Sequence, residues 1–359
     1  ASGAWHCGGR SGLAGAEDLV REAAEVHEAV ARHGAEALGA QLGFSELGAL
    51  CRALTASGHL PDPRLLSAAA AKLRELLKGG ATDAAVGWRD AGAALALAAC
   101  EAGEESGLGA ELVDELVASG AAGLRGGSAL DGMGAAALAL AAAAAGRADG
   151  PLLEALLGRC SAREMDLHPA ALGELRLAAL LAGLEAVDRL DARAAGFLRT
   201  VCADASLDDP RAALLPQEGG AFDEALTPFE AEVSEALDAC EVPHSRAALV
   251  GGLGLVLPAS ALLAGGVSQA GGAAGQGRLA LFAEDWASRA VYANAPSTRT
   301  AFQRWKYAAV AASGWQVFPV EESKWRTLVG RDERAAHLRE LLAATPWKGA
   351  LAADASRTT

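Results

Sequence analysis

The chain has 359 residues, of which 52% are hydrophobic and 21% are charged. This length and apolar content exclude a small disulfide-stapled scaffold and a disordered chain. The net charge is −14, which argues against nucleic-acid binding through an overall basic surface. Only 4% of the residues are aromatic, and the apolar residues are mostly Ala and Leu, which are strong helix formers. The composition therefore predicts a helical protein with closely packed helices.

The cysteines are too widely spaced to form a recognisable framework. None of them pairs as C-x-x-C, so a zinc site is not expected. We expect reduced, mostly buried thiols at Cys7, Cys51, Cys100, Cys160, Cys202 and Cys240. The chain starts at Ala1 without a secretory pattern, which predicts that any targeting segment has been removed or is not included.

A glycine-anchored pattern recurs about every 40 residues in the first two thirds of the chain. The anchoring positions are Gly48, Gly92, Gly134 and Gly173. Each opens an apolar helical stretch, and these stretches end near Gly58, Gly103, Gly146 and Gly183. A second helix follows in each unit, beginning near Pro63, Gly109, Pro151 and Asp191.

Such a period with two helices per unit predicts an α-solenoid over residues 16–205. The first helix of each pair is apolar on all sides, so it must be buried between neighbours. The recurring glycines predict close backbone contact between repeats, because glycine is otherwise unfavourable within a helix. Residues 16–33 are expected to form an N-terminal capping helix. The alternative is that a chain rich in Ala and Gly shows such matches by chance.

The sequence changes character near residue 206. A segment with prolines and a glycine pair predicts a linker over residues 206–225. Helices are then expected at 228–242, 297–313 and 331–343, and strands at 247–250, 253–257, 279–283 and 315–320. This order predicts a small α/β domain over residues 226–345. Residues 1–15 and 346–359 remain as an N-terminal extension and a C-terminal tail.

One uncharged stretch, residues 247–267, is long enough to span a membrane. Its several glycines and Pro258 favour two buried strands with turns instead. The stretch also lacks the aromatic and basic flanks of a membrane helix.

Charge and tryptophan are both unevenly distributed. Residues 277–359 carry 12 Lys and Arg against 8 Asp and Glu, and the rest of the chain carries 19 against 37. The last region also holds Trp286, Trp305, Trp315, Trp325 and Trp347. The sequence therefore predicts an acidic helical part followed by a mildly basic α/β module.

Several segments of this module form a recognisable set. The first is Phe229-x-x-x-Val233-x-x-x-Leu237 followed by Val242-Pro243-His244, and the second is the strand-like run 279–285. A basic helical segment follows at 300–306, and the most specific part is Gly314-Trp315-Gln316-Val317 with Trp325 ten residues after Trp315. In this order the segments resemble the opening helix, central strand, basic helix and final strand of a RAP domain, and the resemblance covers residues 226–345. RAP domains typically follow helical repeats of about this period, as in the Fas-activated serine/threonine kinase family and in octotricopeptide proteins.

The resemblance implies RNA maturation, RNA stability or ribosome assembly in an organelle. It also implies a restriction-endonuclease-like fold, whose chemistry needs clustered carboxylates around a metal ion. Residues 245–283 contain no Asp or Glu, and Phe282 stands where the family usually has an acid. Glu284 and Asp285 follow only at the end of the strand. We therefore predict no nuclease activity, no metal site and no cofactor, and expect a protein that is not an enzyme.

Two basic and aromatic clusters are the candidate RNA-binding residues. A helix over 297–313 would place Arg299, Gln303 and Lys306 on one face, with Arg304 at its border. Its packed stripe would be Phe302, Trp305, Ala309 and Ala312. The second cluster is Lys324, Trp325 and Arg326, where arginine suits phosphate and an aromatic ring suits base stacking. The alternative is a solvated helix face with the tryptophans in the core.

No other motif predicts catalysis. The seven histidines do not pair at metal-ligand spacing, and the glycine run at 271–277 lacks the Lys and Ser/Thr of a phosphate-binding loop. The sequence also lacks a Gly-x-Ser-x-Gly nucleophile motif.

Three functions remain open at this point. The first is a component of an organellar ribonucleoprotein, above all a mitochondrial ribosome subunit or assembly protein that binds rRNA and neighbouring proteins. The second is a free RNA stability or processing factor that reads single-stranded RNA through its repeats; the acidic balance of residues 1–276 argues against it. The third is a protein-interaction solenoid with a vestigial RAP module. The compartment, the mitochondrial matrix with the chloroplast as the alternative, rests on the family resemblance alone.

Overall fold

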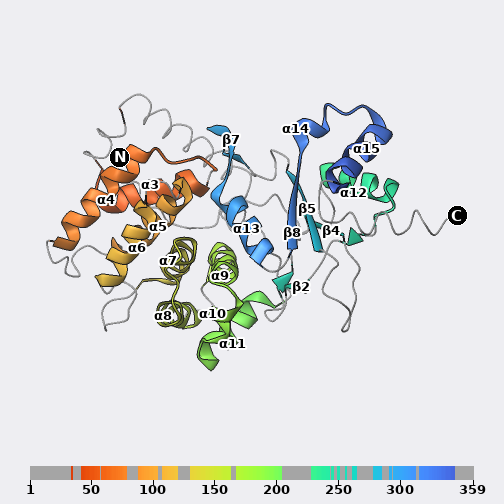
Figure 1. Cartoon of the computed structure of the whole chain (residues 1–359). Helices are drawn as coiled ribbons and strands as arrows, with labels where there is room; N and C mark the ends of the chain where they lie inside the picture. Colours follow the sequence, from red (N-terminus) through yellow and green to blue (C-terminus); the bar gives the residue numbers. More distant parts are fainter. Residues whose placement is uncertain are drawn as a thin grey trace, which may run out of the picture. The chain divides into compact units, whose positions relative to one another are not determined.

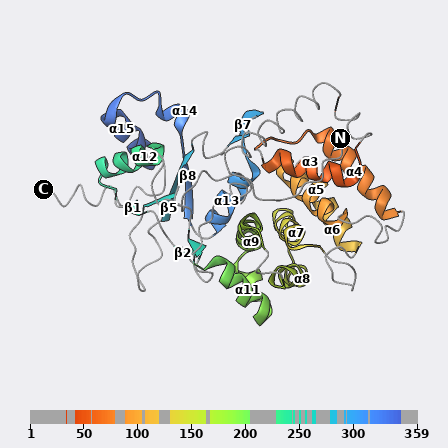
Figure 2. The ribbon, with the colours of Figure 1, turned by 180° about the vertical axis from the view of Figure 1, so that it is seen from behind.

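The computed structural model contains many helices and a small β-sheet near the C-terminus (Figures 1 and 2). It describes residues 34, 42–56, 58–78, 88–103, 107–119, 130–162, 167–203, 228–242, 244–245, 249–250, 255–256, 261–264, 278–284, 291–292, 294–312 and 315–343. The chain divides into two compact units. The helical unit comprises Ala1–Ala178, Asp209–Asp223 and Ala293–Ala295, and the C-terminal unit comprises Ala179–Asp208, Glu224–Tyr292 and Pro296–Thr359.

Helix pairs follow one another through the first part of the chain, as the glycine-anchored pattern predicts. The first helices of the pairs are α3 (Phe44–Ala56), α5 (Trp88–Ala102), α7 (Gly132–Ala144) and α9 (Pro169–Ala182). The second helices of the first three pairs are α4 (Pro63–Lys78), α6 (Leu108–Ala118) and α8 (Gly150–Ser161). Helix α5 packs against both α3 and α7, and each second helix packs against the first helix of its own pair.

Each first helix is followed by a glycine with a left-handed backbone. The angle φ is 75° at Gly58, 131° at Gly103, 66° at Gly146 and 87° at Gly183. Residues with a side chain rarely adopt such angles, which is why glycine is common just after a helix end. The four helix ends predicted from the sequence are therefore confirmed, and they share one conformational cause.

Close backbone contact between neighbouring pairs is confirmed at Gly48. A Cβ atom added to Gly48 on α3 would lie 2.7 Å from the Cβ of Ala91 on α5 and 2.8 Å from its carbonyl oxygen. The absence of a side chain at Gly48 thus allows these two helices to approach each other. Gly92 is different, because its added Cβ would meet Leu116 of the same pair, at 2.8 Å.

The fourth pair departs from the repeat. A short helix, α10 (Leu184–Asp188), separates α9 from α11 (Ala192–Cys202). The carboxylate of Asp191 accepts a hydrogen bond of 2.6 Å from the Ala194 amide and caps α11 at its predicted start. Within the helical unit, Arg52 of α3 lies 3.3 Å from Glu174 of α9. In an extended solenoid only neighbouring repeats touch, so this contact between the first and fourth pairs differs from that simple arrangement.

The C-terminal unit is built on a mixed four-stranded sheet. Its strands lie in the order β1 (His244–Ser245), β4 (Ala261–Ala264), β5 (Arg278–Glu284) and β8 (Trp315–Glu321). The pairings β1–β4 and β4–β5 are antiparallel, and β5–β8 is parallel. Shorter pairs are formed by β2 (Leu249–Val250) with β3 (Leu255–Val256) and by β6 (Val291–Tyr292) with β7 (Ala295–Arg299). A small domain of helices and strands is thus confirmed.

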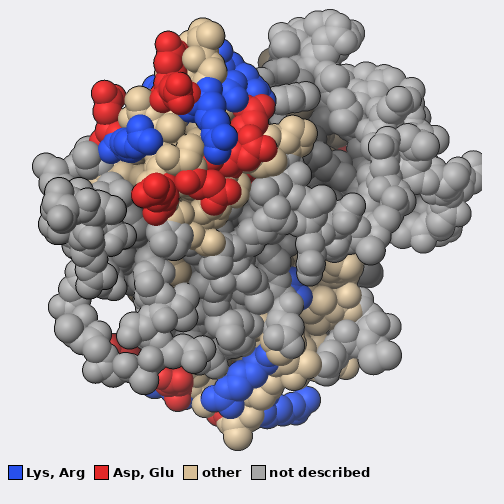
Figure 3. All heavy atoms as spheres, turned by 90° about the vertical axis from the view of Figure 1, so that its right-hand side faces the viewer, with Lys and Arg blue, Asp and Glu red and all other residues tan. Residues whose placement is uncertain are grey.

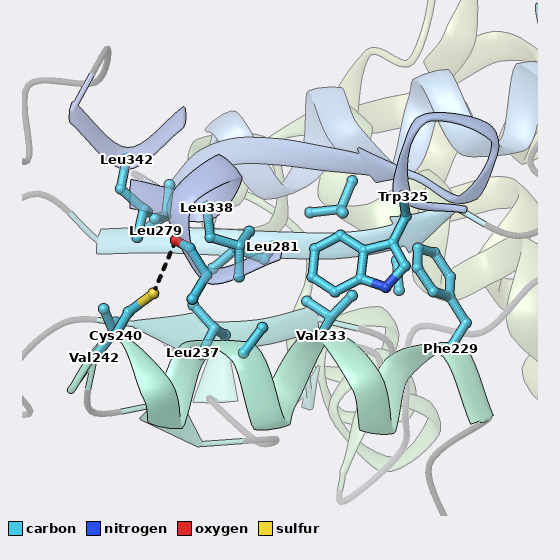
Figure 4. Packing of buried hydrophobic residues seen from close by; sticks show 14 residues of the cluster. Phe229, Val233, Leu237, Cys240, Val242, Leu279, Leu281, Trp325, Leu338 and Leu342 are labelled. Carbon is cyan, nitrogen blue, oxygen red and sulfur yellow. Dashed lines mark hydrogen bonds between the residues drawn. The ribbon is translucent and has the colours of Figure 1, made fainter. Parts of the chain in front are cut away.

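Helices cover both faces of β5 (Figures 1 and 2). On one face, Leu279 and Leu281 pack with α12 (Pro228–Ala239), α15 (Gly330–Ala343) and the short α14 (Glu322–Trp325), as Figure 4 shows. The rings of Phe229 and Trp325 meet edge to face in this core, with centroids 5.9 Å apart. On the other face, Phe282 contacts Tyr307 of α13 (Ala301–Ala312). This alternation follows from the opposite orientation of successive side chains in a strand.

The expected helix over 297–313 is wrong at its start. Residues 297–299 belong to β7, and α13 begins only at Ala301. Buried Thr300 explains the boundary, because its hydroxyl accepts a hydrogen bond of 3.4 Å from the Gln303 amide, and threonine is favoured at this capping position. Ala312 is exposed rather than part of the packed stripe, whereas Phe302, Trp305 and Ala309 are buried as predicted.

The helix expected over 228–242 also ends earlier, at Ala239. Glu241 has a φ of 56° and is the one residue other than glycine with a positive φ in the described part of the chain. Its amide donates to Asp238, and the Val242 amide donates to Leu237, both at 3.0 Å. These two bonds form the reversal that commonly closes a helix, with glutamate in the place that glycine prefers.

The remaining expectations fall into two groups. Strands at 279–283 and 315–320 and the helix at 331–343 are confirmed, and the uncharged stretch 247–267 contains β2, β3 and β4. None of the described helices is long and apolar enough to cross a membrane. The described cysteines are free. The capping helix at 16–33, the linker at 206–225 and both terminal segments lie outside the described residues.

Candidate nucleic-acid interface

Two carboxylates stand side by side where the parallel strands β5 and β8 end. The strand register pairs Glu284 with Glu321. The carboxyl ends of parallel strands are common ligand sites in α/β folds. These two residues and the side chains around them, Arg299, Gln303, Tyr307 and Lys324, are called the strand-end cluster below.

Arg299 contacts both carboxylates of this cluster. Its guanidinium donates two hydrogen bonds to Glu284, from Nε to Oε1 at 2.8 Å and from Nη2 to Oε2 at 3.0 Å, and lies 3.6 Å from Glu321. The Tyr307 hydroxyl donates to Glu284 Oε1 at 2.5 Å, and Gln303 donates to the Tyr307 hydroxyl at 2.7 Å. The two parallel N–H groups of the arginine guanidinium match the two oxygens of a carboxylate. These hydrogen bonds connect β7 and α13 to the end of β5.

The cluster shifts the protonation equilibria of its members. The hydrogen bond to Glu284 raises the pKa of Arg299, so this side chain stays charged. Burial raises the pKa of Tyr307, and the hydrogen bond to Glu284 raises it further, so the phenol stays protonated and acts as a donor. Arg299 and Tyr307 therefore both keep the protons that they donate to the Glu284 carboxylate.

Four of the six residues predicted to bind RNA lie in or beside this cluster. Lys324 pairs with Glu321 at 3.1 Å and keeps 69% of its side chain exposed. Arg304 donates from Nη1 to the Arg299 carbonyl at 3.3 Å. Lys306 lies on the same helix, with its ammonium 5.6 Å from the Phe282 ring centroid. Arg299 itself is on β7 and not on the helix, so the predicted face of Arg299, Gln303 and Lys306 is wrong.

The other two predicted residues belong to a separate cluster around Glu232 of α12. Arg326 donates from Nη1 to both Glu232 oxygens, at 2.7 and 2.9 Å, and also bonds Glu322. The Trp325 indole N–H donates to Glu232 at 3.0 Å, and Arg334 lies 2.9 Å from the same carboxylate. We call these residues the Glu232 cluster.

Trp325 is a core residue. None of its surface is exposed, so its ring offers no face to a base, and the predicted RNA contact through this side chain is corrected. Burial alone would raise the pKa of Glu232, but the hydrogen bonds from Arg326 and Trp325 and the charges of Arg326 and Arg334 outweigh it and lower that pKa. Glu232 therefore remains an acceptor for the indole.

The carboxylates of the strand-end cluster are already engaged by the protein's own side chains. Arg299 and Tyr307 fill Glu284, and Lys324 pairs with Glu321. Within the described ranges, no three His, Cys, Asp or Glu side chains are grouped so that they could hold a metal ion. Asp285 lies outside the described residues.

Figure 3 shows one face of the molecule with charged side chains of both signs. Basic and acidic groups lie next to one another in its upper part rather than in one continuous basic area. Ion pairs in the C-terminal unit include Arg326–Glu322 and Lys324–Glu321. A phosphate contact on the described part of this face would therefore rely on a few cations at defined places.

Sequence reasoning missed the partners that position these cations. Glu232 and Arg326 are 94 residues apart, and Arg299 and Glu284 are 15 apart on different strands. Tyr307 lies one helical turn after Gln303, so its place on the same helix face was accessible from the sequence.

No protein-family model matches the chain, and a comparison with curated proteins finds no match.

Proposed function

We propose that the chain is a non-catalytic, RNA-associated component of an organellar ribonucleoprotein. The best candidate is a mitochondrial ribosome subunit or assembly protein in the matrix, with its helix pairs arranged as a solenoid that contacts neighbouring proteins. In this proposal the C-terminal unit is a RAP-like module that contacts RNA, above all rRNA. The compartment and the family assignment rest on the resemblance described above.

The gathering of Arg299, Arg304 and Lys324 at the strand ends is the observation that carries the RNA contact. Arg299 is held by Glu284 on two hydrogen bonds, yet 37% of its side chain remains exposed. Lys324 has three donors on its ammonium, and in the described structure its one ion pair is with Glu321. Cations in fixed positions suit recognition of a defined phosphate geometry.

The internal pairing of Glu284 and Glu321 supports the non-catalytic part of the proposal. A metal-dependent nuclease needs carboxylates whose oxygens are open to the metal ion and its water. Displacing Arg299 from Glu284 would leave a buried carboxylate without its positively charged partner, which is costly.

Charge pairing on the second helices supports protein rather than RNA contacts for the helical unit. Arg74 of α4 bonds Glu111 and Glu115 of α6, and Arg147 pairs with Asp114. These arginines are already balanced by carboxylates from the neighbouring pair. Together with the acidic balance of residues 1–276, this pairing disfavours phosphate binding along the helices.

The test is RNA affinity of the full chain at two salt concentrations, with total mitochondrial rRNA as the probe. We expect the double variant Arg304→Gln/Lys324→Gln to weaken binding and to reduce the salt slope by about one unit per lost phosphate contact. The matched control is Arg331→Gln/Arg339→Gln on exposed positions of α15, which should leave both quantities unchanged. Arg299 and Arg326 are not substituted because they hold partly buried carboxylates.

Equal behaviour of the two double variants would refute the assignment of the strand-end residues. Sedimentation of the full chain on a gradient distinguishes the two RNA functions. A ribosomal component should travel with ribosomal particles, and a free processing factor should sediment apart from them. If the chain sediments apart from ribosomal particles and also apart from free RNA complexes, the result would favour the protein-interaction alternative.

A further inference from the structure

A serine and a histidine in the C-terminal unit form a hydrogen-bonded pair that the RNA proposal does not use. Ser234 lies in the middle of α12, and His244 begins β1. The Ser234 Oγ is 2.7 Å from His244 Nε2, and His244 Nδ1 is 2.9 Å from the Val242 carbonyl oxygen. Because a carbonyl can only accept, Nδ1 carries the proton in the neutral ring. Nε2 is then the acceptor, and the Ser234 hydroxyl donates to it.

This direction of donation differs from that of other hydroxyls in the helices. Ser67, Ser161 and Thr200 all donate to carbonyl oxygens of their own helix, at 2.9, 3.1 and 3.1 Å. Such local bonds are the usual state of a helical serine or threonine. Ser234 instead directs its proton to the imidazole, which can receive it.

One acidic side chain lies close to the ring in the described structure. Asp238 lies one turn after Ser234, and its carboxylate is 3.9 Å from His244 Nδ1. The side chain of Asp238 is 70% exposed, so solvent screens this contact.

We propose that Ser234 is a base-activated nucleophile that accepts an acyl group from an activated carboxylic ester. The Ser234 oxygen forms a bond to the ester carbonyl carbon while its proton passes to His244 Nε2. The bond from that carbon to the leaving oxygen then breaks, the electron pair departs with this oxygen, and the imidazolium returns the proton to it. The arrangement is that of a nucleophile and an adjacent base whose tautomer is fixed by a third group.

The place of Ser234 in a helix limits the class of ester. Helix amides are engaged in the helix itself, so α12 does not offer the backbone donors that stabilise an oxyanion in hydrolases. Only esters with a good leaving group, such as aryl esters, react readily without that help. Ser234 is half-buried, and 9% of the His244 side chain is exposed, which restricts the reaction to small esters.

The experiment uses the full chain and p-nitrophenyl acetate. We expect a burst of nitrophenolate equal to one acetyl group per chain, and peptide mapping should place that group on Ser234. Ser234→Ala should abolish the burst. His244→Gln can still hydrogen-bond the serine but is a poor base, so it should slow acetylation about 100-fold or more.

Ser67→Ala, which removes an exposed helical serine bonded to its own backbone, is the matched control and should keep the full burst. The far-UV circular dichroism of each variant is compared with that of the parent, so that a folding defect is recognised. If Ser234→Ala does not fold, mapping of the acetylated parent chain decides the question alone. Acetylation of Ser234 no faster than that of Ser67, or an unchanged rate in a folded His244→Gln variant, would overturn the proposal.

Discussion

The two units of the molecule fill their cores with side chains of different size. In the helical unit, α7 buries almost only alanine, glycine and leucine, and neighbouring helices approach closely at Gly48. In the C-terminal unit, the core contains the large rings of Phe229 and Trp325, and ion pairs surround it. The first unit should therefore be sensitive to added volume, and the second to the loss of a side chain or a partner.

Two carboxylates differ in a related way: Glu174 is buried, and Glu232 is partly exposed. In the helical unit, Glu174 has Arg52 at 3.3 Å but one oxygen without any hydrogen bond, and burial raises its pKa to about 7. In the C-terminal unit, Glu232 receives donors from several side chains, and its pKa is lowered despite the opposing effect of burial. Desolvation controls the first group, and hydrogen bonding controls the second.

The largest expected effect is the loss of the Trp325 side chain. Trp325→Ala should cost about 3–5 kcal/mol of unfolding free energy, because it leaves a cavity between α12 and β5 and removes a donor from Glu232. Hydrogen exchange read by mass spectrometry should show faster exchange in α12 and α15. Exchange in α5 and α7 should stay as in the parent chain, and equal acceleration there would contradict a separate core.

Added volume should act on the helical unit. Gly48→Ala places a methyl group against the Ala91 backbone and should destabilise by about 1–3 kcal/mol, as urea unfolding followed by circular dichroism would measure. Gly158→Ala in α8 makes the same change in open space. It should stabilise by about 0.5–1 kcal/mol, because alanine is the better helix former. Equal signs for the two variants would refute close contact at Gly48.

Burial of Glu174 should make the helical unit less stable as the pH rises. Its pKa is raised from an ordinary value of 4.5 to about 7 in the folded chain, so the folded state holds the proton more tightly than the unfolded state. The resulting stabilisation is complete below pH 4.5 and is lost as the pH rises through 7, by an amount on the order of 3 kcal/mol. Urea unfolding at several pH values measures this slope.

Glu174→Gln keeps the shape of the side chain and should flatten that slope. Part of the slope should remain in this variant, because burial followed by the charge of Asp131 raises the pKa of Asp90 to about 6. Glu75→Gln on the exposed face of α4 is the matched control. A slope that is the same in all three chains would show that Glu174 is not buried as a carboxyl.

How much of this molecule was predictable depends on how local each signal is. The helix ends in the first part are confirmed because Gly58 and its three counterparts act within one turn. The start of α13 was missed because the helical periodicity of the sequence continues on the N-terminal side of Thr300, whereas the capping hydrogen bond of Thr300 starts the helix at Ala301. The pairs Arg299–Glu284 and Arg326–Glu232 depend on the sheet and on the packing of α12, which the periodicity does not specify.

The smallest expected effect is a gain at the end of α12. Glu241 adopts a φ of 56°, a conformation that costs a residue with a side chain about 1–2 kcal/mol. Glu241→Gly should therefore stabilise the C-terminal unit by about 0.5–1 kcal/mol, since glycine also loses more freedom on folding. Glu241→Gln is the control, because it removes the charge and keeps the strained backbone. Hydrogen exchange of α12 in both variants separates the two causes: protection should rise for glycine alone, and an equal rise for glutamine would assign the effect to charge.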